Sequence, residues 1–285
     1  MSDLRTAVRE ATARLAAAGV ASPEADAVAL AAHVLGSDPG QVRRAMVLGA
    51  VEPEGYAALV AERADRVPLQ HLTGVAHFRR LTLAVGPGVF VPRPETEVTA
   101  GLAIGAASEL GPDAVVVDLC TGSGAIALAV KDELPRARVL AVEVSDLAHG
   151  WAVANRDRLG LDVELRLGDA TTAFEDLVGD VDVVVSNPPY IPVGAVPVDP
   201  EVRDHDPSVA LYGGSADGLA IPLAVAARAA ALLRVGGVLV MEHADSQGTA
   251  LPRALRAAGG WADVVDHLDL AGRPRTTVAV RAAAL

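Results

Sequence analysis

Residues 115–124 read VVVDLCTGSG. The apolar start has the composition of a buried strand, and Asp118 precedes a loop with glycines at positions 122 and 124. Glycines let backbone N–H groups approach a ligand closely, and the N-terminus of a following helix favours a negative group such as a carboxylate. With Ala127 the segment also fits the loose dinucleotide pattern, so it does not by itself distinguish NAD from S-adenosylmethionine. It predicts a nucleoside-binding turn between a strand and a helix.

Strand and helix patterns alternate from about residue 113 onward. Apolar runs predict strands at 115–119, 138–142, 163–167, 181–186 and 238–242, with helices at 125–133, 146–159 and 219–234. Two late strands are expected at 262–267 and 276–281, the last of them antiparallel. This alternation predicts an α/β domain with a largely parallel sheet.

The N-terminal part has a different pattern, that of a small helical bundle. Apolar residues recur with helical spacing over residues 3–18, and Ser22-Pro23-Glu24 is a typical helix start. Further short helices are predicted after Asp38-Pro39 and over residues 53–66. Such a bundle carries no chemistry of its own and is expected to contact a partner.

Three parts of the chain follow from these patterns. We expect residues 1–68 to form a helical domain that recognises a partner, and residues 69–97 to form a hairpin followed by a stiff linker. The linker shows partial apolar alternation and then two prolines, which stop both helix and sheet pairing. Residues 98–285 form the catalytic domain.

The composition argues against several classes of protein. About half of the 285 residues are apolar, which is ample for a core, yet no apolar run reaches the ~20 residues that a membrane span needs. The first residues lack the layout of a signal peptide, and a single cysteine suits a reducing compartment. The net charge of −12 disfavours a broad contact with nucleic acid. We expect a monomeric cytoplasmic enzyme without a metal, a membrane contact or a direct nucleic-acid contact.

Two further strand ends carry acidic residues that suit a nucleoside. Glu143 ends the second strand, 19 residues after Gly124, where a carboxylate can accept both ribose hydroxyls. Asp169 follows the third strand and could accept a proton from an adenine amino group. Cys120 is expected to be a small core-facing residue rather than a nucleophile, because no basic group stands near it in sequence.

The fourth strand ends in Ser186-Asn187-Pro188-Pro189-Tyr190, which should face the ligand site. An amide or aromatic amino nitrogen is a poor nucleophile, because its lone pair is delocalised. If the Asn187 side-chain oxygen and the Pro188 carbonyl each accept one N–H, the lone pair turns toward a sulfonium methyl and the developing positive charge is stabilised. Tyr190 can pack against the planar substrate group and near the sulfonium. The chain has only two asparagines, which also suggests that Asn187 is needed.

The tetrapeptide at 187–190 in this context resembles the exocyclic-nitrogen methyltransferases, a group that includes DNA adenine, some RNA and protein glutamine enzymes. Further segments are similar to those of the release factor glutamine methyltransferases. They are Pro68–Gly74 with Phe78, Val91–Glu97, Glu201–Asp204, Pro207, Ala210–Gly214, Asp217–Leu219, and Asp269–Arg273 with Arg275. Together they cover nearly all of residues 68–281, and the N-terminal part is similar in length and helical character only.

The resemblance implies a seven-stranded class I, Rossmann-like methyltransferase domain behind a helical bundle and a hairpin linker. It also implies methylation of the glutamine in the Gly-Gly-Gln tripeptide of class I peptide-chain release factors, with S-adenosylmethionine converted to S-adenosylhomocysteine. By analogy, the cofactor contacts Asp118, Cys120, Thr121, Gly122, Ser123, Gly124, Glu143, Asp169, Ala170 and Asn187. The substrate glutamine contacts Asn187, Pro188, Pro189 and Tyr190, and Arg93, Glu95 and Thr96 shape a lid beside the site.

Departures from the family pattern are few. Cys120 stands where a glycine is common, Glu143 where an aspartate is common, and His71 where a tyrosine is common. Cys120 keeps its backbone N–H and needs only an allowed φ, and the longer Glu143 can still bridge a ribose.

Four other functions fit parts of the sequence. A glutamine methyltransferase of a ribosomal protein would share the loop and the tetrapeptide, and a nucleic-acid adenine methyltransferase would share the mechanism but should show a basic face. A silent module that binds translation factors would not explain an intact Asn187. An NAD oxidoreductase would leave the tetrapeptide without a role.

Overall fold

The computed structural model describes residues 3–283, which form two compact units. Unit 1 comprises the chain up to Val75 together with Pro197–His205. Unit 2 comprises Ala76–Val196 and the chain from Asp206 onward. The chain therefore passes between the units three times, and a short piece of the sequence after the tetrapeptide at 187–190 folds with the N-terminal helices.

Unit 1 is a bundle of helices. They are α1 (Leu4–Ala17), α2 (Pro23–Leu35), α3 (Pro39–Val47), α4 (Tyr56–Ala64), α5 (Leu69–Thr73) and α9 (Pro200–His205). The sequence sets their starts, because Asp3 accepts a hydrogen bond from the Thr6 backbone N–H at 3.0 Å and Asp38 forms a capping box with Gln41. The predicted helices of this region are confirmed.

Helix α9 is held in unit 1 by a buried ion cluster. Glu201 is 7% exposed, and its carboxylate accepts hydrogen bonds from Arg63 Nη1 at 2.7 Å and Arg66 Nε at 2.8 Å. Arg63 Nε also donates to Asp26 at 2.8 Å. These donors hold the pKa of Glu201 well below its usual range despite burial, which acts the other way. The cluster fixes the segment that follows the catalytic tetrapeptide.

Unit 2 contains a seven-stranded sheet in the order β5-β4-β3-β6-β7-β9-β8. Its strands are β3 (Val115–Leu119), β4 (Arg138–Glu143), β5 (Val163–Leu167), β6 (Val181–Ser186), β7 (Leu233–Glu242), β8 (Trp261–Leu268) and β9 (Pro274–Arg281). The pairs from β5 to β7 are parallel, and β9 pairs antiparallel with β7 and β8. The predicted α/β domain with a largely parallel sheet is confirmed, including the antiparallel last strand.

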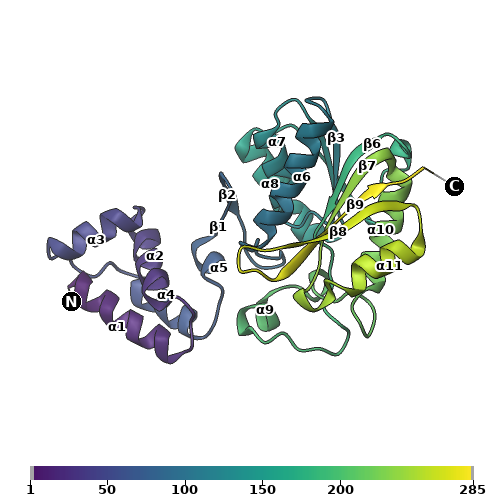
Figure 1. Ribbon diagram of the computed structural model, residues 1–285. Helices are drawn as coiled ribbons and strands as arrows, with labels where there is room; N and C mark the ends of the chain where they lie inside the picture. Colours follow the sequence, from purple (N-terminus) through teal and green to yellow (C-terminus); the bar gives the residue numbers. More distant parts are fainter. Residues whose placement is uncertain (1–2, 284–285) are drawn as a thin grey trace. The chain divides into compact units, whose positions relative to one another are not determined.

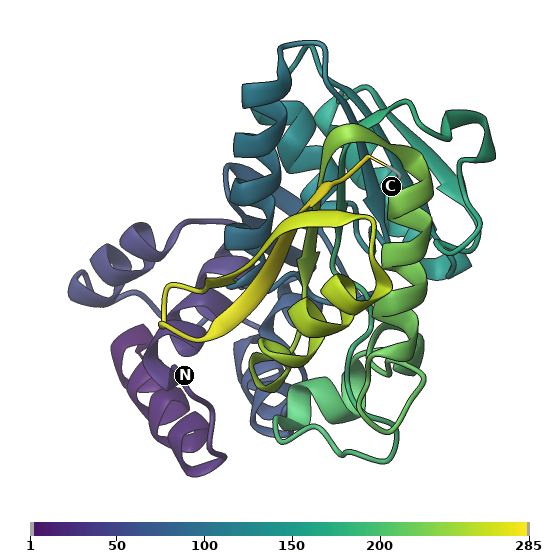
Figure 2. The same cartoon turned by 45° about the vertical axis from the view of Figure 1, so that its right-hand side comes forward.

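Helices cover both faces of this sheet (Figure 1). They are α6 (Thr96–Leu110), α7 (Ala125–Glu133) and α8 (Asp146–Leu159) on one face, and α10 (Ala220–Leu232) and α11 (Ala250–Ala258) on the other. Neighbouring strand residues face opposite cores, so that Val116 packs with α6 and α7 while Val117 packs with α10 and α11. Figure 2 shows α11 beside the β8–β9 pair at the sheet's end. Helix α6 was not predicted from the sequence.

A two-stranded hairpin precedes α6. Strands β1 (Val75–Phe78) and β2 (Leu81–Ala84) confirm the predicted hairpin. The buried Asn155 side chain in α8 accepts from the Ala84 N–H at 2.6 Å and donates to the carbonyls of Ala84 and Ser123. One of the two asparagines thus ties the hairpin to the glycine loop. Among the helices that the structure describes, none is long and apolar enough to cross a membrane.

Candidate active site

The predicted cofactor residues and the tetrapeptide lie at the carboxyl ends of the neighbouring parallel strands β5, β4, β3 and β6. The loop after β3 turns at Cys120, Gly122 and Gly124, which have φ values of 71°, 58° and 84°. A Cβ at Gly124 would lie 2.9 Å from Leu128 Cδ1, so only glycine fits there. Gly124 then leads into α7, which places the helix N-terminus at the site.

Asp118 is buried at the end of β3. Its Oδ2 accepts hydrogen bonds from Thr121 Oγ1 at 2.6 Å and from the Ala127 N–H at 3.2 Å. Burial raises the pKa of Asp118 to about 7, although these two donors oppose the rise. Within residues 3–283, neither its Oδ1 nor the buried Ser123 Oγ has a hydrogen-bond partner. Buried polar atoms of this kind suit a polar ligand in the loop.

Glu143 connects two backbone segments at the end of β4. Its Oε2 accepts from the Gly122 N–H at 2.8 Å, and its Oε1 accepts from the Ser145 N–H at 2.9 Å. Each carboxylate oxygen keeps a second lone pair that a ribose hydroxyl can use. The side chain therefore both shapes the glycine loop and faces the ligand position.

Asp169 stands at the end of β5 in a hydrogen-bonded turn. Its Oδ1 accepts from the Thr171 N–H at 2.8 Å and from Thr171 Oγ1 at 2.7 Å, which holds the pKa of Asp169 below its usual value. Ala170 beside it is buried. An ionised carboxylate next to a small apolar residue suits an adenine ring with its amino group.

Cys120 has a left-handed backbone conformation, and this explains why a glycine suits the position. Burial and the Glu143 carboxylate raise the pKa of its thiol above its usual value, which disfavours the thiolate form. The cysteine is thus a poor nucleophile at neutral pH. The sequence predicts that Cys120 needs only an allowed φ. Its φ of 71° lies in the left-handed region, where the backbone of a residue with a side chain is strained.

Cys120→Gly is therefore expected to stabilise the protein. A left-handed conformation destabilises an L-residue by about 1–2 kcal/mol, and glycine removes this strain. The greater freedom of glycine in the unfolded chain opposes the gain by about 0.5–1 kcal/mol. We expect a gain of roughly 0.5–1 kcal/mol in the free energy of unfolding, measured by urea denaturation. Gly122→Ala, at a φ of 58° with open space around its Cβ, should give a change of the opposite sign. A destabilised Cys120→Gly variant would contradict this explanation.

The tetrapeptide at the end of β6 is held from several directions. Ser186 Oγ donates to the Leu119 carbonyl at 2.5 Å, and Asn187 Nδ2 donates to Thr96 Oγ1 at 3.3 Å. Pro188 and Pro189 are buried, and Tyr190 is half-buried. Because an amide group is planar, a bond from Nδ2 to Thr96 directs the Asn187 Oδ1 away from Thr96 and leaves it available as an acceptor.

Tyr190 is fixed at both its backbone and its ring. Its carbonyl accepts from Gln247 Nε2 at 3.0 Å, and its hydroxyl donates to Glu242 Oε1 at 3.4 Å. A Cβ at Gly218 would lie 2.1 Å from the same carbonyl, so the glycine allows this close backbone approach. Glu242, Gln247 and Gly218 were not predicted as site residues, since their sequence neighbourhood indicates only a strand end and a turn.

The structure places the predicted lid residues at the start of α6. Arg93 Nη2 donates to the buried Asp206 at 2.6 Å, and its guanidinium lies 5.0 Å from the Phe90 ring centroid. Glu95 directly precedes α6, and Thr96 is its first residue. Thr96 is thus hydrogen-bonded to Asn187, whereas the side chain of Arg93 forms an ion pair with Asp206. The substrate contacts of Arg93 and Glu95 stay predictions.

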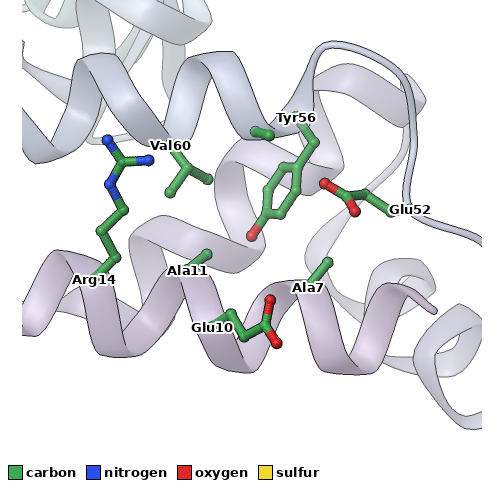
Figure 3. A pocket seen from close by; sticks show the side chains of 8 residues that line it. Ala7, Glu10, Ala11, Arg14, Glu52, Tyr56 and Val60 are labelled. Atoms are coloured by element: carbon green, nitrogen blue, oxygen red, sulfur yellow. The ribbon is translucent and has the colours of Figure 1, made fainter. Parts of the chain in front are cut away.

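A separate hollow of about 210 Å³ lies within unit 1 (Figure 3). It is formed by α1 and α4, and its lining comprises Ala7, Glu10, Ala11, Arg14, Glu52, Tyr56, Ala57 and Val60. Figure 3 shows the Tyr56 ring between the two helices and the charged groups of Glu10, Arg14 and Glu52 around it. An apolar floor with a charged rim is suited to a protein contact rather than to catalysis.

Comparison with known proteins gives a consistent picture. Residues 6–74 match the model of the PrmC N-terminal domain, and residues 81–197 match the model of the methyltransferase small domain. The release factor glutamine methyltransferase of Streptomyces coelicolor is 51% identical over 99% of both chains. A Streptomyces pristinaespiralis enzyme named as a 4-amino-L-phenylalanine/4-methylamino-L-phenylalanine methyltransferase is 40% identical over 90% of this chain and 89% of its own.

A solved structure supports the fold. The methyltransferase from Pyrococcus furiosus superposes with a TM-score of 0.52 at 16% identity, covering 80% of this chain and 98% of that chain. At this identity the likeness shows the fold alone. The seven-stranded sheet with its antiparallel last strand is thus a methyltransferase sheet.

Proposed function

Because the chain belongs to the release factor glutamine methyltransferase family, we propose that it methylates the side-chain amide nitrogen of the glutamine in the Gly-Gly-Gln motif of class I peptide-chain release factors. The observation that supports this most strongly is the orientation of Asn187. Its Nδ2 is bound to Thr96, and its Oδ1 is left to accept a substrate N–H at the carboxyl end of β6. Beside it lies the glycine loop with its buried, unsatisfied polar atoms.

S-adenosylmethionine is the cofactor, and it supplies an electrophilic methyl group on a sulfonium. Residues 120–124 and Asp118 would hold its amino-acid part, Glu143 its ribose, and Asp169 with Ala170 its adenine. The free Asp118 Oδ1 and the glycine loop fit such a ligand, since an ammonium needs an acceptor and a carboxylate needs backbone N–H groups. Thr121, Ser123 and the remaining polar groups of the loop would line the rest of this cofactor site.

The side chains of this protein then act on the acceptor amide. Asn187 Oδ1 and the Pro188 carbonyl each accept one amide N–H, which turns the nitrogen lone pair toward the methyl group. S-adenosylmethionine would supply the methyl group to this nitrogen and would leave as S-adenosylhomocysteine. The positive charge on nitrogen is stabilised by the same two acceptors, and a proton is then lost to water. Tyr190 packs against the planar amide.

The test is a methyl-transfer assay with isotope-labelled S-adenosylmethionine on a purified release factor, followed by peptide mass spectrometry. We expect one methyl group on the Gly-Gly-Gln glutamine and none when that glutamine is replaced by alanine. Label in a ribosomal protein, in nucleic acid or only in an aromatic amine would overturn the choice of substrate. The ribosomal-protein and adenine alternatives are thereby tested in the same experiment.

We infer that unit 1 recognises the body of the release factor. The hollow between α1 and α4 is the surface that this inference rests on, since the exposed Ala57 and the charged side chains of Glu10 and Arg14 line it. The reaction is proposed to take place in the cytoplasm, with a monomeric enzyme that binds neither a membrane nor nucleic acid directly. The net charge of −12 supports the last point, because phosphate contacts need clustered basic residues.

Ala57→Arg tests this surface by filling the hollow from an exposed helix position. We expect kcat/KM on the whole release factor to fall about ten-fold, as expected for the loss of one interface contact of about 1.4 kcal/mol. Turnover of a short Gly-Gly-Gln peptide should be unchanged, because the peptide lacks the body of the release factor that unit 1 is proposed to recognise. Ala58→Arg is the matched control, since Ala58 is also exposed on α4 but does not line the hollow. Equal effects of both variants would remove the hollow from the docking surface.

A further inference from the structure

Glu242 is a buried acid beside the catalytic tetrapeptide that the mechanism above does not use. It is the last residue of β7 and is 1% exposed. Ser186 pairs with Met241 across β6 and β7, so the two chains continue side by side into Asn187 and Glu242. A carboxyl group at this position is costly to bury, and it should therefore have a defined set of partners.

The partners of Glu242 are hydroxyl groups from several elements. Its Oε1 accepts from the Tyr190 hydroxyl at 3.4 Å, and its Oε2 accepts from Thr99 Oγ1 at 3.2 Å. Thr99 also shares a hydrogen bond of 2.7 Å with Thr276 on β9. Thr96, whose Oγ1 accepts from Asn187 Nδ2, lies close enough to Glu242 that its hydroxyl lowers the pKa of the carboxyl. The carboxylate thus contacts Tyr190 directly and reaches Asn187 through Thr96.

The direction of these hydrogen bonds follows from the chemistry of the groups. An ionised carboxylate only accepts, so a hydrogen bond between Thr96 and Glu242 has the Thr96 hydroxyl as its donor. The Thr96 oxygen is then left with lone pairs, and it accepts from Asn187 Nδ2 at 3.3 Å. Asn187 consequently presents Oδ1 to the substrate. A neutral acid could instead donate to Thr96, whose hydroxyl could then donate to Asn187 and consume the acceptor oxygen.

We propose that Glu242 is a positioning residue for methyl transfer, whose carboxylate sets the orientation of the Asn187 amide through Thr96 and holds the Tyr190 ring. This role rests on the proposed function of Asn187 as the acceptor for the substrate amide. Glu242 itself does not contact the substrate. Its effect is therefore on turnover rather than on binding of the cofactor.

The surroundings of Glu242 predict how the reaction depends on pH. The charged and titratable groups that face it are Arg275 from β9, Glu95 before α6, and Tyr190. Burial raises the pKa of Glu242 to about 7, while Thr96, Arg275 and Thr99 oppose the rise. The proportion of enzyme with a correctly oriented Asn187 should fall as the pH falls through that value. We expect kcat to show an acidic limb near pH 7.

Asp118 has a raised pKa in the same range and could give a similar limb through cofactor binding. Saturating S-adenosylmethionine removes this contribution, because kcat then reports on the complex with both substrates bound. The measurement therefore uses kcat rather than kcat/KM, between about pH 5.5 and 9.

Glu242→Gln is the main variant, since it removes the charge with little change in shape. We expect kcat above neutral pH to fall about 10- to 100-fold, with KM for the release factor and Kd for S-adenosylmethionine within about three-fold. The acidic limb should disappear. Thr96→Val breaks the link to Asn187 and should lower kcat to a similar extent. The double variant should be no worse than either single one, because both changes act on one chain of hydrogen bonds.

Thr277→Val is the matched control. Thr277 lies next to Thr276 on β9, is buried, and in the described part of the chain its Oγ1 has no hydrogen-bond partner. This variant replaces a buried hydroxyl near the cluster without touching it, so kcat should stay at the wild-type value. An equal loss in Thr277→Val would show a general sensitivity of packing and would overturn the proposal.

Two other results would overturn it. One is a Glu242→Gln enzyme with kcat within two-fold of wild type or with an unchanged acidic limb. The other, which decides the matter if Glu242→Gln fails to fold, is a Thr96→Val enzyme with wild-type turnover. A wild-type enzyme that transfers no methyl to the release factor would contradict the proposed function instead, so the two failures are distinguishable.

Discussion

Replacing Asn187 by alanine is expected to lower kcat for methylation of a release factor by about 100- to 1,000-fold, while Kd for S-adenosylmethionine should change less than about five-fold. The loss is large because Oδ1 is one of two acceptors for the substrate amide, and it acts most strongly as positive charge develops on the nitrogen. The cofactor loop is anchored independently by Asp118 and Glu143. Single-turnover kinetics and calorimetric titration with the cofactor separate the two quantities.

Asn187→Asp is an informative companion to the alanine variant. It keeps an acceptor oxygen but loses the Nδ2 donor to Thr96, so the oxygen is no longer oriented. We expect a turnover between those of the wild type and the alanine variant. Near-normal turnover of Asn187→Ala would remove Asn187 from the mechanism and, with it, the role proposed for Glu242.

Replacing Glu201 by alanine is expected to destabilise unit 1 by about 3–5 kcal/mol, the usual cost of removing one partner of a buried ion pair. Arg63 and Arg66 would lose the carboxylate that accepts their hydrogen bonds. Arg203→Ala on the same short helix is the matched control, because its partner Asp204 is exposed and such surface pairs contribute little to stability. Thermal unfolding and limited proteolysis of residues 197–205 measure the difference. Equal stability of the two variants would contradict the structural role of the cluster.

The pH dependence of this contribution has a definite sign. The folded-state pKa of Glu201 is lowered below its ordinary value of 4.5, so its stabilising effect is complete above that value. The effect is lost as the pH falls through the folded-state pKa. The stability difference between wild type and Glu201→Ala should therefore shrink on strong acidification.

The sequence predicted the strands and most helices of unit 2 closely, because buried parallel strands appear as continuous apolar runs. The strand at 181–186 is found as Val181–Ser186, and the helix at 146–159 as Asp146–Leu159. Strand β7 begins at Leu233 rather than at residue 238, since Gly236 and Gly237 interrupt the apolar pattern. Helix α6 was missed, because the expected linker ended at Glu97 and the small residues after it have no clear helical stripe.

Other features depend on contacts between residues that are far apart in sequence. The pairing of Arg63 with Glu201 spans 138 residues, and no local pattern indicates it. The role inferred for Glu242 requires the order of β6 and β7 and the position of α6, none of which its neighbours in sequence reveal. The left-handed Cys120 is a similar case, since a residue type alone does not give its φ.

The divided sequence of unit 1 has a consequence for how substrate specificity can be exchanged between relatives. A chimera that transplants only the chain up to Val75 would bring a bundle without its own α9, and the host's Glu201 would meet foreign residues in place of Arg63 and Arg66. A working graft has to carry residues 197–205 as well. Unit 1 is thus built from two separate pieces of sequence, and the second piece begins seven residues after Tyr190. Changes that adapt unit 1 to a new partner are therefore constrained by the neighbouring tetrapeptide, for which we propose the catalytic role.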